Sequence, residues 1–152
     1  MANSQAMCTS FKGELLSATH NFSSANPAHT ANTADTFKAA LYLTTASLGA
    51  ATTAYSATGE VSGTGYSAGG VAVTNAVNPT TSGTTAYWTP SASITYTSVT
   101  LSTAFDTVLI YNSSQSNKAV SVHTFGSQTV TAGTFALTMP TNAAGTALIN
   151  IA

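Results

Sequence analysis

The chain has 152 residues, the size of one ordinary domain, and 5% of them are charged, against about 25% in soluble proteins. Three lysines and no arginine stand against four acidic residues, so the sequence lacks the basic surface that nucleic-acid binding requires. No apolar run reaches the ~18 residues of a membrane span, and a single cysteine, Cys8, excludes a disulfide framework and a cysteine-based zinc site within one chain.

Hydrophobic residues make up 43% of the chain, which is enough for a core, and we expect one β-rich domain over residues 1–152. The first segment has a helical period that predicts a short amphipathic helix over residues 7–18, with Ser4 as its N-cap. The apolar face of this helix packs on a sheet or, as the alternative, docks on a partner chain through Phe11 and Leu15. That face is formed by Met7, Cys8, Phe11, Leu15, Ala18 and Phe22.

Two loops flank the first predicted strand. Residues 19–34 are small and polar, include Pro27, and predict a loop. A strand with a mainly buried core is expected over residues 36–44. Residues 45–70, rich in Gly, Ala, Ser and Thr, predict a long irregular connection. A loop of that length in a compact domain is usually functional or an interaction surface.

From Val71 onward the pattern is almost entirely that of β-strands. Short alternating or apolar segments recur, with turn signals between them, at 112–117 and 131–133 most clearly. This spacing predicts a mainly β fold, a β-sandwich or a jelly-roll-like barrel, with one short N-terminal helix. The expected strands lie at 71–73, 84–89, 94–99, 107–112, 119–125, 134–139 and 147–151.

Glycines cluster between Gly59 and Gly70 in a spacing that only loosely resembles a dinucleotide-binding turn. A strand-like segment follows instead of the helix that would hold a pyrophosphate, and no P-loop lysine is present. The stretch therefore predicts an ordered loop whose glycines adopt positive φ. Because glycine also lets a second backbone approach closely, we take five residues of this loop as candidate interface residues: Gly63, Gly65, Tyr66, Gly69 and Gly70.

The titratable residues form no catalytic constellation. Glu60 is expected to fix the glycine loop by accepting backbone hydrogen bonds. His123 and Asp106 can be combined with a serine into a triad, but no Gly-x-Ser-x-Gly motif is present, and we expect His123 at the surface or in an interface. The histidines, His20, His29 and His123, do not give metal-ligand spacing, which leaves a metal held between two chains as the alternative. We predict no enzyme activity, no cofactor, no metal and no small-molecule substrate.

Aromatic residues offer another class of function. Tyr87 with Trp88, and Tyr66 with Tyr55, could stack on sugars in a carbohydrate-binding or adhesive module. An aromatic residue beside a turn serves equally well as a core residue or a protein contact. The low charge of the chain points to the protein-contact interpretation, since a surface of Ser, Thr, Ala and Gly suits a protein packed against neighbours.

Several segments together resemble a family of small structural proteins of tailed bacteriophages. They are residues 55–70 and Trp88, then 105–111 and 125–135, and residues 11–16 and 35–42 fit the same pattern. The resemblance covers most of the chain in order. It implies a virion protein, often a capsid cement or decoration protein and sometimes a neck or tail component, with no catalytic residues to transfer.

The same resemblance implies the partners and the location. The expected partners are the major capsid protein and other copies of this chain, with no nucleic acid and no membrane. The protein would be assembled into the virion in the host cytoplasm, where a reduced Cys8 is stable.

Overall fold

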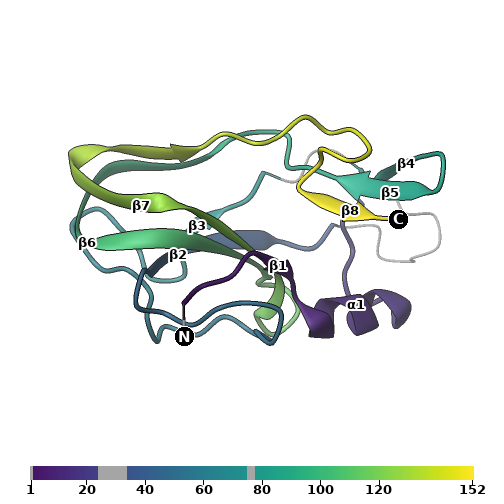
Figure 1. Cartoon of the computed structure of the whole chain (residues 1–152), viewed down its shortest axis with the longest axis horizontal. Coiled ribbons are helices and arrows are strands. Elements are labelled where there is room, and N and C mark those ends of the chain that lie inside the picture. The colour runs from purple at the N-terminus through teal and green to yellow at the C-terminus, as the bar shows by residue number, and fades with distance from the viewer. Residues whose placement is uncertain (1, 24–33, 75–77) are drawn as a thin grey trace.

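The computed structural model describes residues 2–23, 34–74 and 78–152, and it confirms the mainly β fold with one short helix (Figure 1). The strands form two antiparallel sheets in a β-sandwich-like arrangement. The elements in chain order are β1 (Ala6–Met7), α1 (Thr9–Leu16), β2 (Phe37–Leu43), β3 (Val71–Ala72), β4 (Thr80–Ser82), β5 (Thr85–Trp88), β6 (Ile94–Asn112), β7 (Lys118–Leu137) and β8 (Ile149–Ile151).

The larger sheet has the strand order β1-β7-β6-β2-β3, and the smaller one has the order β4-β5-β8. A long hairpin of β6 and β7 forms the centre of the larger sheet, and its connecting turn over residues 113–117 confirms the predicted turn there. Ser116 and Asn117 adopt positive φ in that turn. The apolar run from Thr107 to Asn112 is central, as expected, because β2 and β7 flank it on both sides.

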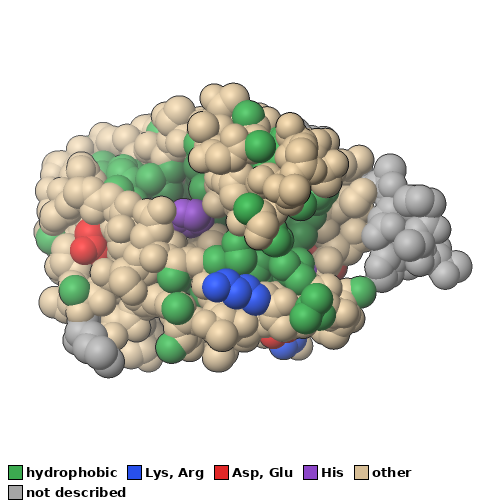
Figure 2. All heavy atoms as spheres, turned by 45° about the vertical axis from the view of Figure 1, so that its right-hand side comes forward, with side chains coloured by type: hydrophobic (Ala, Val, Ile, Leu, Met, Phe, Trp, Pro, Cys, Tyr) green, Lys and Arg blue, Asp and Glu red, His purple; other side chains and the backbone are tan. Residues whose placement is uncertain are grey.

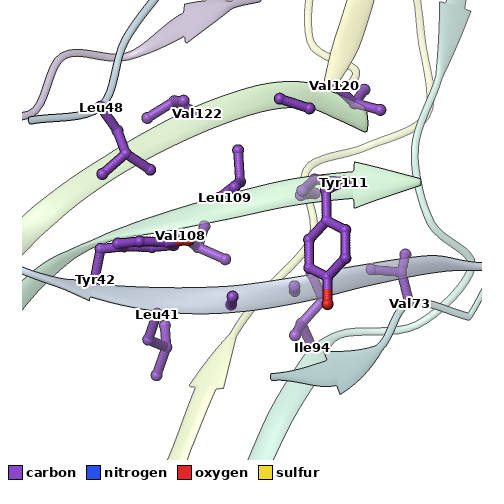
Figure 3. Close-up of a cluster of buried hydrophobic side chains, with 14 of the residues drawn as sticks. Leu41, Tyr42, Leu48, Val73, Ile94, Val108, Leu109, Tyr111, Val120 and Val122 are labelled. Carbon is purple, nitrogen blue, oxygen red and sulfur yellow. The ribbon is translucent and has the colours of Figure 1, made fainter. Parts of the chain in front are cut away.

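The main core lies against this central part of the larger sheet. Figure 3 shows buried side chains of β2, β6 and β7, among them Leu41, Val108, Leu109 and Val122, and Leu41 points away from Leu109 and Val122, so apolar side chains are buried on both faces of the sheet. All four are at most 3% exposed. Burial of apolar side chains on this scale is the principal source of stability for such a domain.

An aromatic cluster links the two sheets. Phe22 stacks on Phe37 of β2 with ring centroids 4.4 Å apart, and it meets Trp88 of β5 edge-on at 4.9 Å. Phe37 and Trp88 lie 6.0 Å apart and are both at most 2% exposed. These three rings therefore place the smaller sheet on the larger one.

Two predicted breaks in the strands of the hairpin, between 99 and 107 and at 131–133, were wrong. Residues 94–112 form one continuous strand, and the expected turn at 131–133 lies inside β7. The register between β6 and β7 shifts at several places, and Ser98 and Ala132 adopt positive φ at such places. Extra residues in an antiparallel pair are absorbed as β-bulges, which carry the same glycine and positive-φ signals as a turn.

The helix is shorter than predicted and begins later. Residues 6 and 7 are paired with β7 as β1, so α1 starts at Thr9, and Cys8 rather than Ser4 is the N-cap residue. Ser4 instead donates its backbone N–H to the carbonyl of Leu48 at 2.8 Å. Helical periodicity did not reveal that the N-terminal arm finds hydrogen-bond partners on the sheet. Of the predicted loop 19–34, residues 24–33, including Pro27 and His29, lie outside the described residues.

The long connection over residues 45–70 is irregular, as expected, apart from isolated bridges. It covers the sheet beside β2, because Leu43 donates to the Gly59 carbonyl at 2.9 Å and Val61 donates to the Leu41 carbonyl at 3.0 Å. Within the described ranges, no helix is long and apolar enough to cross a membrane.

Candidate protein-binding surfaces

The glycines of the loop make their close approach to the protein's own sheet. Gly63 lies against the Thr100 carbonyl and Gly65 against the Ser98 carbonyl, both on β6. A Cβ atom at either position would overlap those oxygens, and Gly65 also has a φ of 78°. The prediction of positive φ in this loop is therefore confirmed. The close approach that these glycines allow is made within the chain, and a contact of Gly63 and Gly65, which are exposed, with a partner stays a prediction.

Glu60 fixes the loop, as predicted. Its Oε1 accepts hydrogen bonds from the Tyr66 hydroxyl at 2.7 Å and from the Gly69 backbone N–H at 2.8 Å. Its Oε2 accepts one from the Tyr55 hydroxyl at 2.6 Å. Hydrogen bonds to a charged acceptor are stronger than neutral ones, so one carboxylate holds three points of an otherwise irregular segment.

Further tyrosines fasten the loop to the strands beneath it. The Tyr66 hydroxyl accepts the Leu41 backbone N–H of β2 at 3.0 Å, and the Tyr111 hydroxyl of β6 donates to the Gly69 carbonyl at 2.8 Å. Burial and the hydrogen bond to Glu60 raise the pKa of Tyr55 to about 12, so it stays a neutral donor. Tyr66 and Gly69 are therefore parts of an internal fastening, and Gly69 is buried.

The predicted apolar face of the helix turns inward. Phe11 is 1% exposed and packs against His20 and Phe22, with ring centroids 5.0 and 5.9 Å away. Phe11 is therefore a core residue, which corrects its assignment as an interface candidate. Leu15 is half-buried and remains accessible at the margin of the core.

His123 and Asp106, which the sequence allowed as members of a catalytic triad, do not bind each other. Asp106 accepts hydrogen bonds from Asn3 at 2.8 Å and from the Thr107 hydroxyl at 2.7 Å, and so ties down the N-terminal arm. His123 is half-buried, and its Nε2 forms a hydrogen bond with the Ser121 hydroxyl at 2.9 Å. Ser121 itself is 2% exposed. Burial lowers the pKa of His123 to about 4, so its ring is neutral at pH 7.

A polar network that the sequence did not reveal joins the helix to the hairpin turn. Glu14 of α1 pairs with His20 at 2.7 Å and with Lys118 at the start of β7. Although burial opposes its charge, hydrogen bonds from Lys118 and His20 lower the pKa of Glu14. The Asn112 amide then bridges His20 Nδ1, at 3.0 Å, and Asp35, at 2.7 Å. These residues lie too far apart in the sequence for any spacing rule to connect them.

The structure also bears on metal binding, on the reactivity of the cysteine and on sugar stacking. Among the described residues no group of three or more His, Cys, Asp or Glu side chains could hold a metal ion. Burial, with a smaller contribution from Glu14, raises the pKa of Cys8 to about 11, so the thiol is protonated. Trp88 is 2% exposed, and the Tyr66 ring stacks on Tyr96 with ring centroids 5.8 Å apart, so Trp88 presents no ring face to a sugar and one face of Tyr66 is covered.

An apolar groove lies between α1 and β8. Leu16 is 92% exposed and Ile151 is 43% exposed, and they are the large hydrophobic residues that the described surface exposes most. In Figure 2 hydrophobic side chains gather on this face around a basic residue. The lining residues are Met7, Lys12, Leu15, Leu16, Asn150, Ile151 and Ala152. Periodicity missed the groove because Leu16 lies off the buried face of the helix and β8 is distant in sequence.

A small cavity opens beside this groove. It has a volume of about 90 Å³, and its lining side chains are apolar, among them Leu15, Tyr87, Trp88 and Ile149. The groove and the cavity together form what we call the α1–β8 surface. Exposed apolar patches rimmed by polar residues are typical of sites that bind a protein, a membrane or a ligand.

No family model, no curated protein and no solved structure matches this chain.

Replacing Glu60 by alanine should destabilise the protein, because three donors lose their acceptor. We expect the free energy of unfolding to fall by about 2 kcal/mol in urea titrations, and the Gly69 amide to exchange faster with solvent. Glu60→Gln is the matched control and should cost less, since its amide oxygen can still accept from Gly69. Equal stability of Glu60→Ala and the wild type would contradict this role.

His123 should make stability depend on pH. The unfolded ring binds a proton near pH 6.5 and the folded ring only near pH 4, so stability is complete above 6.5 and falls as the pH drops through 4. Because the ring is half-buried, we expect about 2 kcal/mol or less. His123→Gln should lose less stability than the wild type between pH 6.5 and 4, measured by urea unfolding. The two proteins should show parallel behaviour above pH 7, and parallel curves at acid pH as well would refute the assignment.

Proposed function

We propose that the protein is a structural component of a tailed-bacteriophage virion, a capsid cement or decoration protein that stabilises the shell through protein–protein contacts. The resemblance of the chain to such proteins supports this role, as does its β-sandwich-like fold. The observation that carries the proposal is the α1–β8 surface, where Leu16 is 92% exposed beside an apolar cavity. An exposed apolar patch of this kind gains free energy when a partner covers it.

The manner of attachment follows from the charges. The four carboxylates all accept hydrogen bonds within the chain, and Lys118 is paired with Glu14. Exposed ion pairs contribute little and are screened by salt. Attachment therefore comes mainly from burial of apolar and small polar surface, at about 25 cal/mol per Å² before the costs of association.

Virions produced from the genome that encodes this chain test the proposal. Quantitative mass spectrometry of purified particles should find the protein in many copies, in a fixed ratio to the major capsid protein. Copies matching a single ring would instead assign it to the neck or tail. Absence from purified virions, with the protein present in the infected cell, would refute a virion role.

The bound protein should resist salt. Washing the same particles in low salt and in molar sodium chloride should release similar, small amounts of this protein, because few charges contribute to the contact. The free wild-type protein mixed with the particles before washing serves as a control for loose adsorption. Wholesale release at high salt would show that charged groups dominate the attachment.

A further inference from the structure

The outer edge of β8 is open. In the smaller sheet β8 pairs with β5 alone and ends the strand order β4-β5-β8, so within the described residues no strand pairs with its other edge. Alternate residues of such an edge direct their N–H and C=O groups outward. In Figure 1 α1 lies on the side of β8 away from β5.

The groove borders this open edge. Asn150 and Ile151 are consecutive in β8, so their side chains point to opposite faces of the sheet, yet both line the groove together with Leu15 and Leu16 of α1. A groove lined by both faces of a strand runs along its edge. One wall is therefore a helix, and the other is a strand edge that no other described strand pairs with.

Resting on the proposed function, we infer that this groove holds an extended segment of a different protein, which adds to the edge of β8 as a further strand and places an apolar side chain in the neighbouring cavity. Strand addition supplies main-chain hydrogen bonds for affinity, and pockets for alternate side chains supply specificity. The occupant is thus a β-forming, alternating apolar peptide.

The cavity favours an apolar side chain. Its volume is about 90 Å³ and its lining residues are aliphatic and aromatic, with Leu15, Tyr87 and Ile151 among its walls. Water inside it would find few hydrogen-bond partners, so filling it with a branched aliphatic group is favourable. Ile149 and Ile151 both line the cavity, which places it beside the strand that the peptide would join.

Charge identifies the occupant as another protein and not a second copy of this chain. Lys12 lines the groove, is exposed, and has no carboxylate within ion-pair distance among the described residues. None of the four side-chain carboxylates of a second copy is fully exposed, and each is held in place by an internal hydrogen bond, so none projects from the surface toward Lys12: Glu14 binds His20, Asp35 binds Asn112, Glu60 binds Tyr55 and Asp106 binds Asn3. A partner segment that carries an acidic residue complements Lys12, and a second copy does not.

A displayed library of random peptides, selected on the immobilised full chain, tests the inference. We expect recovered peptides to alternate apolar and polar residues and to carry an acidic residue. Leu16→Asp should weaken their binding at least about tenfold in calorimetry, and Lys12→Glu should weaken it less. Thr129→Asp, which adds the same charge at an exposed site on β7, is the matched control and should bind as the wild type.

Two measurements separate strand addition from nonspecific apolar contact. N-methylation of alternate backbone amides of a selected peptide should abolish binding in one register and not in the other. The amides of residues 149–151 should exchange more slowly in the complex. Failure to select any peptide, equal binding to Leu16→Asp, or indifference to N-methylation in both registers would overturn the inference. Such a result would leave the virion measurement, and the proposed function with it, untouched.

Discussion

The acceptance of three hydrogen bonds by Glu60 holds together the part of this protein that has no regular structure. Without that carboxylate the loop over residues 45–70 would rely on backbone hydrogen bonds, isolated bridges and the remaining contacts of the tyrosine hydroxyls with the strands. Tyr55, Tyr66 and the Gly69 amide converge on it, and further hydroxyls fasten the same loop to β2 and β6. As a consequence, the loop covers the edge of β2 that β3 leaves unpaired, at Leu41 and Leu43.

The other carboxylates act in the same way at other joints. Glu14 joins α1 to the base of the hairpin through Lys118, and Asp35 reaches Asn112 at the hairpin turn. Asp106 holds the N-terminal arm through Asn3. In a chain with so few charges, each of these three acids thus links segments distant in sequence. The surface is left almost without charge, which makes burial the main way for this protein to bind a partner.

The outer edges of β7 and β8 differ for a physical reason. Beyond Ser121 and Val122, which pair with β1, the outer edge of β7 is interrupted by register shifts and by the positive φ of Ala132. Bulges of this kind twist an edge away from regular pairing and protect it from aggregation. β8 has no such interruption in its described pairing with β5, and a helix and an apolar cavity border it. This contrast is why we assign partner binding to β8.

The sequence by itself determined the fold class, because alternation and turn residues are local signals that report burial on one face of a strand. It also identified the central strand near residues 107–112, the turn at 112–117 and the structural role of Glu60, since a lone acid among glycines has few other uses. It did not distinguish a bulge from a turn at 131–133, because both use small residues and positive φ.

Only the tertiary structure decided which surfaces are free. Phe11 and Leu15 lie on the same predicted apolar face, yet Phe11 is in the core and Leu15 stays partly exposed, because the depth of burial along that face depends on how α1 packs. The glycine pattern in the sequence is the same whether the backbone that approaches belongs to the same chain or to a partner. The α1–β8 groove joins residues more than a hundred positions apart, and contacts of that range arise from the packing of the sheets, which no local pattern encodes.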